Sequence, residues 1–361
     1  MRMTVGELMT RLRNEGIASE GDIGAVRSVL DASVEHEMPI YLRALVALGA
    51  WVATILLIVF FYAIHLLDDR TTALVFGVVL VGGAAWLRRR SNGDFTRHAA
   101  VAASFAGQGL IVTAVEAIDH GQGMPFIVAV LISLVMIVVF PDPLHRFVSA
   151  AIAVGATAAA LVVLHVAHAL DVTALTAAFA CAWVWRDRPW RRSDDLTEML
   201  TPVGYGLAIG LFALCLFSAF YSTVGHPYEH APQFGAVTTN GVAVMLAALV
   251  LVILREHDTS PSSIAGVAIL VIIALFAALT AKSPGIIIGA GILLLGFDRR
   301  NLVLIELASA FLIVFGAANY YNLDLTLLEK SGILVASGAL CLVARLFVGK
   351  LLVAGKEALP E

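Results

Sequence analysis

Histidine and acidic side chains gather near the ends of several apolar runs, and they are the residues in this sequence most suited to chemistry. His165 and His168 are closely followed by Asp171, and His226 and His230 flank a glutamate. Imidazole and carboxylate groups bind zinc and similar ions, and histidine also relays protons near neutral pH. Because His165 and His168 are three positions apart, a helix would place them on one face. These five residues form a candidate metal or proton site.

The same residues also have a purely structural interpretation. A histidine is favourable at the C-terminal end of a helix, where the helix dipole is negative. Histidines, tyrosines and acids are also ordinary residues at a membrane–water interface. The sequence leaves both interpretations open, and it indicates no cofactor.

Two more polar residues lie within apolar runs. Gln108 lies near the middle of its run, and Glu306 lies roughly 8 Å past Asn301 at 1.5 Å per helical residue. An ionisable group at membrane depth usually faces the interior of a bundle or a cavity. Glu306 has the alternative of reaching back to Arg299 or Arg300 at the membrane edge.

Motifs of soluble enzymes are absent from the sequence. It contains no HExxH, GxSxG, Walker loop or glycine-rich dinucleotide motif. Cys181, Cys215 and Cys341 all lie in apolar runs without disulfide or zinc spacing, which is typical of small packing residues. No basic face with interleaved aromatic residues indicates nucleic acid.

The elements that would position these residues are membrane-spanning helices. Hydrophobic residues make up 60% of the 361 and charged residues 14%, against about half and a quarter in soluble domains. The apolar residues form runs of the length that crosses a hydrocarbon core of about 30 Å. Twelve runs are predicted: 42–66, 71–87, 98–118, 124–140, 147–168, 171–185, 201–223, 235–254, 262–281, 284–297, 301–319 and 327–348.

The basic residues predict the orientation of these helices. If all twelve runs span, twenty of the 23 Lys and Arg residues fall in one set of loops. Only Arg70, Lys282 and Lys330 fall on the other side. The positive-inside rule then places both termini in the cytoplasm of a bacterial inner membrane. The predicted fold is an all-α polytopic transmembrane bundle of about twelve helices, arranged as six hairpins whose tips point outward.

Three regions are expected along the chain. Residues 1–38 predict a cytoplasmic amphipathic helical segment, residues 39–349 the transmembrane bundle, and residues 350–361 a short cytoplasmic tail. The sixth and tenth runs are short, and a short span interrupted by Gly or Pro is a weak indication of a transport site.

The C-terminal part carries a resemblance to a known family. Tyr320 and Tyr321 lie in a tyrosine-rich loop, and the segment TLLEKS, with Thr326, Glu329 and Lys330, precedes a glycine-containing apolar helix. Together with LGAWVAT at 48–54, this pattern resembles the bacterial membrane family called domain of unknown function 4401. Thr326 and Glu329 also have the spacing of a helix capping box, so we interpret them first as capping residues, with contact to a partner or ligand as the alternative.

The resemblance implies a polytopic inner-membrane protein without an assigned activity. Members are commonly encoded beside another polytopic protein and a small exported protein, which implies a membrane complex with an exported partner. Our first hypothesis is therefore a non-enzymatic, transport-linked subunit of such a complex. A self-sufficient secondary transporter or ion-coupled permease is the alternative, and an intramembrane transferase is the third.

Overall fold

The computed structural model describes residues 69–90, 93–119, 123–186, 194–223, 234–256, 263–280 and 283–322, with single positions within 49–63 and 328–342. Everything described is helix or connection, and no strand occurs in these ranges. The predicted segment at 1–38 and the tail at 350–361 lie outside the described residues.

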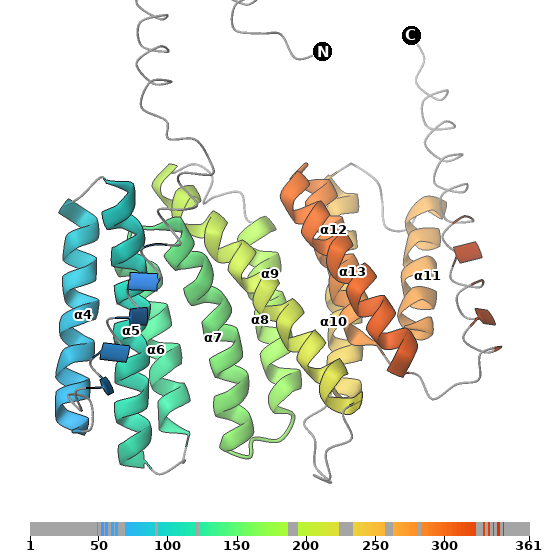
Figure 1. The fold of residues 1–361 in the computed structure, drawn as a ribbon. Coiled ribbons are helices and arrows are strands. Elements are labelled where there is room, and N and C mark those ends of the chain that lie inside the picture. Colours follow the sequence, from blue (N-terminus) through green and yellow to red (C-terminus); the bar gives the residue numbers. More distant parts are fainter. Residues whose placement is uncertain are drawn as a thin grey trace, which may run out of the picture.

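Ten helices are described, and each overlaps one of the predicted apolar runs, from the second to the eleventh (Figure 1). They are α4 (Arg70–Arg90), α5 (Asp94–Asp119), α6 (Met124–Val139), α7 (Pro143–Val163), α8 (Ala169–Arg186), α9 (Asp194–Thr223), α10 (Ala236–Glu256), α11 (Ile264–Leu279), α12 (Pro284–Asp298) and α13 (Leu302–Asn322). The all-helical prediction is confirmed for these residues. Most of the first and last predicted helices lies outside them.

Five helical stretches are long and apolar enough to cross a membrane: Arg70–Arg90, Phe95–Glu116, Pro143–Val163, Leu196–Ala219 and Ala236–Glu256. Shorter apolar stretches, such as Met124–Val139 and Pro284–Asp298, accompany them. A bundle with these stretches has lipid as its surroundings. The tenth predicted run corresponds to α12, which is one of these shorter stretches because it contains only 15 residues.

Several helices begin where their sequences predict. Asp142 is the N-cap of α7, and its carboxylate accepts hydrogen bonds from the backbone N–H groups of Leu144 and His145. Pro143 follows it at the position where a missing N–H costs nothing. Ser263 caps α11 in the same way by accepting from the Gly266 N–H at 3.1 Å.

The end of α7 corrects one prediction. The run at 147–168 was expected to be helical throughout, with His165 and His168 on one face, but α7 ends at Val163. The His165 N–H bonds the Val162 carbonyl and the Val166 N–H bonds the Leu161 carbonyl, which is the pattern of a Schellman motif. His165 and His168 both have a left-handed backbone, with φ of 54° and 59°. They therefore lie in the α7–α8 turn.

Contacts between helix ends bring distant loops to the same side of the bundle. Arg88 at the end of α4 and Arg97 at the start of α5 both bond Asp142 in the α6–α7 turn. Arg299 in the α12–α13 turn donates to the backbone carbonyl of Arg186 at the end of α8. This grouping agrees with alternating hairpins, because all five residues belong to the predicted basic side.

Close packing joins the two halves of the bundle through α7 and α9. A Cβ atom on Gly206 would collide with the backbone carbonyl of Phe147, and one on Gly210 would lie 2.9 Å from Cβ of Val154. Contacts at both levels make α7 and α9 run in the same direction. Glycine is needed at these positions because a side chain would separate the backbones.

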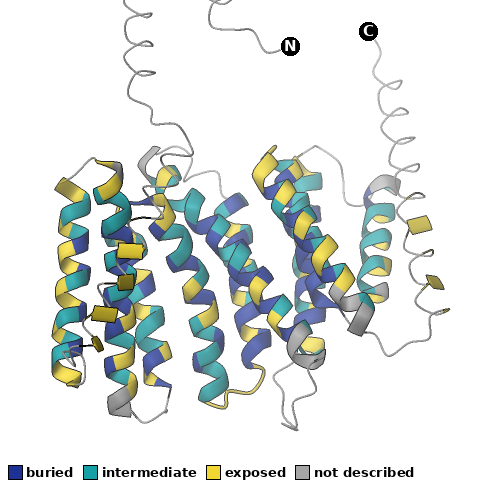
Figure 2. Ribbon diagram, viewed as in Figure 1, coloured by how far each residue is buried: buried dark blue, intermediate teal, exposed yellow. Residues whose placement is uncertain are grey.

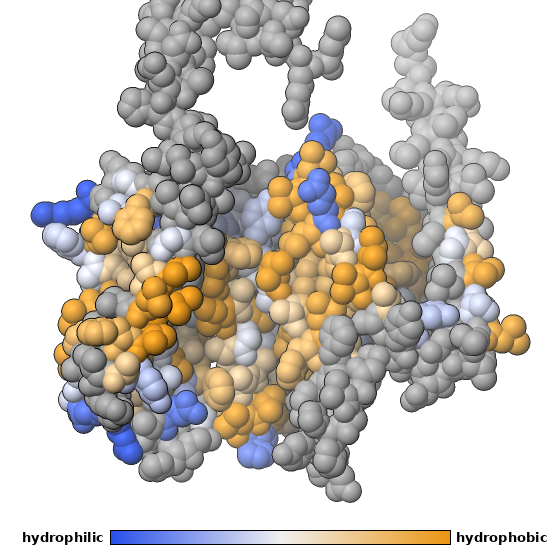
Figure 3. Space-filling model, in the orientation of Figure 1, coloured by the Kyte–Doolittle hydropathy of each residue, from blue (hydrophilic) through white to orange (hydrophobic). Residues whose placement is uncertain are grey.

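The largest buried cluster lies among α7, α8, α9, α10, α12 and α13, and a smaller one joins α4, α5 and α6 (Figure 2). The tenth predicted helix, α12, packs closely against α13. A Cβ on Gly285 or Gly289 would lie 2.6 Å from the ring of Phe315 or 2.7 Å from Leu312. The outer face of the helices is largely apolar in the view of Figure 3, as contact with lipid chains requires.

Candidate functional site

A buried aspartate with two arginines marks one end of the α4–α7 part of the bundle. Asp142 is fully buried, and its Oδ2 accepts from Nε of Arg97 at 2.6 Å and Nε of Arg88 at 3.2 Å. Its Oδ1 accepts the two backbone N–H groups at the start of α7. Every hydrogen bond of this carboxylate therefore holds a helix end in place, and the two cations compensate its charge.

These partners keep Asp142 ionised. Burial raises the pKa of Asp142, but the Arg97 hydrogen bond, the charges of Arg97 and Arg88 and the His145 N–H outweigh it and hold that pKa below its ordinary value of 3.8. An isolated buried carboxylate would instead bind a proton. The group acts as a fixed negative charge three residues before His145.

His145, one turn into α7, is the buried titratable residue beside this ion pair. Its ring lies between the rings of Phe105 and Phe140, with centroids 4.4 and 4.2 Å away and interplanar angles of 8° and 19°. No part of the residue is exposed. A neutral imidazole fits this apolar sandwich, and an imidazolium would gain from the electron-rich ring faces.

Both nitrogens of His145 have polar partners. Nε2 lies 2.9 Å from the Ser104 hydroxyl and 3.2 Å from the Gln108 amide, and Nδ1 lies 3.1 Å from the Ser149 hydroxyl. The Gln108 amide also donates to Ser104. A hydroxyl can donate or accept, and an amide can present either end, so these partners satisfy the ring in either protonation state.

The local sequence explains why these side chains meet. Ser104 and Gln108 are four residues apart on α5, and His145 and Ser149 are four residues apart on α7, so each pair shares a helix face. Arg97 lies seven residues before Ser104, on nearly the same face. We call the set Arg88, Arg97, Ser104, Gln108, Asp142, His145 and Ser149 the Asp142–His145 site.

Of this site, sequence reasoning found only Gln108, as a polar residue inside an apolar run. It missed Asp142 and His145, although a signal existed. The Phe-Pro-Asp-Pro segment ending at Pro143 combines an aspartate N-cap with proline at the first helical position, which predicts a helix start. The signal locates Asp142 at a helix start, but the arginines lie about 45 and 54 residues earlier, and only folding brings them there.

The predicted outward histidine site is only partly within the described residues. His168 Nδ1 lies 2.9 Å from Oδ2 of Asp171. The other carboxylate oxygen, Oδ1, accepts from the backbone N–H groups of Gly235 and Thr238 and from the Thr238 hydroxyl. Asp171 thus caps α10 from α8, with both oxygens already bonded.

The remaining partners of that site are not described. His226 and His230 lie outside the described residues, and His165 is exposed in the turn. No group of three His, Cys, Asp or Glu side chains suited to a metal occurs in the described part of the chain. A metal at these residues stays a prediction.

The other residues singled out from sequence are placed as follows. Glu306 lies on the exposed face of α13, so it does not face the described bundle interior. Tyr320 and Tyr321 lie in the last turn of α13, while Thr326, Glu329 and Lys330 lie outside the described residues. Cys181 and Cys215 are buried free thiols.

A family model matches residues 39–351, nearly the whole chain. The chain belongs to the family described as Domain of unknown function (DUF4401). The resemblance inferred from sequence is thereby confirmed at the level of the family. The DUF4401 match assigns no activity to the Asp142–His145 site. Neither curated proteins nor solved structures gave a match to the chain.

Proposed function

We propose that this DUF4401 protein is a multi-pass protein of the bacterial cytoplasmic membrane with about twelve spans and both termini in the cytoplasm. Twenty of its 23 basic residues support this orientation. The contacts of Arg88, Arg97 and Asp142 on one hand, and of Arg186 and Arg299 on the other, join loops of the same predicted side. The Asp142–His145 site then lies at the cytoplasmic end of the bundle.

For a protein with this membrane topology, we infer a non-enzymatic role linked to ion-coupled transport. The observation that carries this inference is His145, a fully buried titratable group near the cytoplasmic end of the proposed span, whose two nitrogens both have polar partners. Ionisable residues inside a membrane are costly and typically belong to ion or proton pathways. A purely packing role would be served as well by a residue without hydrogen-bonding groups.

The surrounding residues support proton handling. Asp142 supplies a fixed charge on the cytoplasmic side of His145, and Arg97, with 38% of its side chain exposed, connects that charge to solvent. Ser104 and Gln108 continue the hydrogen bonding along α5 towards mid-membrane. A proton on His145 is accommodated by rotating hydroxyls and the amide, without breaking the helix packing.

A transferase is less well supported by these residues. Such an enzyme needs acids, histidines or arginines around a cavity that admits substrate. The two described cavities, between α8 and α10 and at the adjoining face of α12, are lined mainly by apolar side chains. The polar cluster around His145 is packed tightly between aromatic rings instead.

Proton flux into liposomes tests the transport-linked proposal. We expect protein purified from native membranes, together with any partner that co-purifies, to pass protons in vesicles with an entrapped pH dye under an imposed gradient, and His145→Gln to reduce the initial rate at least tenfold. His98→Gln, on α5 but outside both candidate sites, is the matched control and should keep the wild-type rate. Equal rates for wild type and His145→Gln would refute the role of His145.

Whether the protein acts alone is a separate question. The family resemblance favours a complex with another polytopic protein and a small exported protein, and a self-sufficient transporter is the alternative. Native-membrane purification should recover a second polytopic protein in stoichiometric amount if the complex exists. A solitary protein that passes protons in liposomes would favour the self-sufficient transporter.

Orientation has its own test. A reporter active only outside the cytoplasm should be silent when fused after Arg90, Arg192 or Arg300, and active near Gly121 or Tyr228. The reverse pattern at two of these sites would overturn the assigned orientation without bearing on His145.

A further inference from the structure

A groove of about 620 Å³ opens between α8 and α10 on the outer face of the bundle. The two helices run in parallel and are joined at both ends. Asp171 at the start of α8 caps the start of α10, and Arg186 at the end of α8 pairs with Glu256 at the end of α10, at 3.1 Å. Between these two connections the walls are apolar, with Phe179 and Trp183 on α8.

The length of the groove matches one leaflet of a membrane. On α10 its lining runs from Val244 to Glu256, which is about 18 Å at 1.5 Å per residue. Half of a hydrocarbon core is about 15 Å. Phe179 and Val244 are among the most exposed lining residues, at 64% and 68%, so the groove is open to the surroundings along its side.

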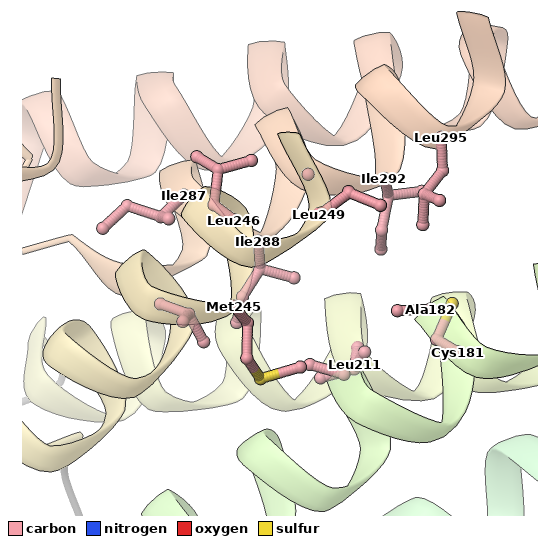
Figure 4. A pocket seen from close by; sticks show the side chains of 13 residues that line it. Cys181, Ala182, Leu211, Met245, Leu246, Leu249, Ile287, Ile288, Ile292 and Leu295 are labelled. Carbon is pink, nitrogen blue, oxygen red and sulfur yellow. The ribbon is translucent and has the colours of Figure 1, made fainter. Parts of the chain in front are cut away.

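The floor of the groove borders a second, smaller cavity. Ala182, Met245 and Leu249 line both the groove and a half-open apolar space of about 50 Å³ between α8, α9, α10 and α12 (Figure 4). Small or flexible residues at this boundary allow a hydrocarbon chain to lie deep between the helices. The lining of this smaller cavity is almost entirely apolar, which favours a hydrocarbon chain over water at this point.

The charged end of the groove determines which headgroup fits. Arg186 donates through Nη2 to Glu256 and has 19% of its side chain exposed, while its Nη1 is buried and has no hydrogen-bond partner in the described part of the chain. A phosphate is a natural partner of a guanidinium group that is partly exposed, as that of Arg186 is. The Glu256 carboxylate disfavours a purely anionic headgroup, because it would repel the phosphate.

We propose that this groove binds a phosphatidylethanolamine molecule of the cytoplasmic leaflet. Its phosphate bonds Arg186, its primary ammonium lies beside Glu256, and one acyl chain follows Trp183, Ala248 and Val244 towards mid-membrane. Phosphatidylcholine carries the same charges, but its quaternary ammonium has no N–H to donate to the carboxylate. The leaflet assignment rests on the orientation proposed above, whereas the binding itself does not.

Native mass spectrometry of the full chain in detergent tests this proposal. We expect phosphatidylethanolamine to be retained at least fivefold more than phosphatidylcholine or phosphatidylglycerol with the same acyl chains. Arg186→Gln should abolish this preference, and Ala248→Phe, which fills the groove, should reduce retention of all three lipids at least fivefold. Arg255→Gln and the lipid-facing Ala310→Phe are the matched controls, and both should retain lipid as the wild type does.

Several results would overturn the proposal. Equal retention of phosphatidylethanolamine and phosphatidylcholine would remove the role of the ammonium, and stronger retention of phosphatidylglycerol would indicate an anionic-lipid site. Equal losses in Arg255→Gln or Ala310→Phe would move the binding away from this groove. Because the assay uses detergent-purified protein, a failed proton-flux or topology experiment leaves its result unaffected.

Discussion

Two buried aspartates, at opposite ends of the bundle, stabilise helix ends in different ways. Asp142 caps its own helix and pairs with two arginines from α4 and α5. Asp171, in the first turn of α8, caps a different helix, α10, mainly through backbone N–H groups and a hydroxyl. Both side chains are almost completely buried.

The difference follows from the surroundings. The basic loops of the predicted cytoplasmic side supply cations to Asp142, whereas the opposite side has few basic residues, so Asp171 uses neutral donors and His168. Hydrogen bonds from oriented N–H groups can hold a buried carboxylate without a counter-ion. A buried aspartate is therefore evidence for a helix cap in both regions, and evidence for an ionic site only near Asp142.

Removing Asp142 should have the largest effect. Asp142→Ala deletes the cap of α7 and leaves Arg88 and Arg97 facing each other without their anion. Breaking a buried ion pair costs about 3–5 kcal/mol, so the melting temperature in detergent should fall markedly. Asp142→Asn keeps the cap, since asparagine caps well, and should recover part of the loss. Identical losses in the two variants would show that the cap contributes little.

Removing Asp171 should have a smaller effect. Asp171→Ala leaves the N–H groups of Gly235 and Thr238 without their acceptor, and an unsatisfied buried donor costs about 1–3 kcal/mol. The melting temperature should fall, but less than in Asp142→Ala, because no cation loses its partner. A greater fall in melting temperature in Asp171→Ala than in Asp142→Ala would show that Asp171 contributes more to stability than Asp142 does.

His165→Gly tests whether His165 serves only to form the α7–α8 turn or also binds a metal. His165 has a left-handed backbone with φ of 54°, which glycine adopts without strain. If the turn is purely structural, the variant should be more stable by about 1 kcal/mol. Metal analysis and melting with added zinc provide the check. Zinc that stabilises the wild type but not this variant would support the predicted metal site.

Acidification should give the smallest change in melting temperature, and that change should be specific to the Asp142 carboxylate. The pKa of Asp142 in the folded protein lies below its ordinary value, so its ionisation stabilises the fold above about pH 4 and this contribution is lost as the pH falls further. The gap in melting temperature between wild type and Asp142→Asn should therefore narrow below pH 4. A constant gap would mean that the ion pair adds no net stability.

Much of the architecture could be predicted from the sequence. Apolar runs located all ten described helices, because a bundle in lipid must have outer faces as apolar as its core and each span must have a minimum length. Helix ends were less predictable. The apolar run through His168 continues past the Schellman motif at His165, since hydropathy does not distinguish a helix from an apolar turn.

The candidate site was much less predictable. Gln108 stood out because it is polar within an apolar run, but nothing in the local sequence of His145 indicates two aromatic rings around it. The histidines that stood out, His165 and His168, lie in an exposed turn instead. Spacing along one helix gives the residues that share a face, and it contains no information on which other helix packs against that face.

The sequence by itself determined the family, the helical class and the lipid surroundings, because these depend on composition and on the period of apolar residues. The tertiary structure alone decided which polar groups became partners. Arg88 and Arg97 meet Asp142, and Arg186 meets Glu256, only because α4, α5, α6 and α7, and α8 and α10, pack with their ends aligned. The physical reason is that a buried charge must find a counter-charge or hydrogen-bond donors, here on other helices, and that choice depends on packing between segments far apart in the chain.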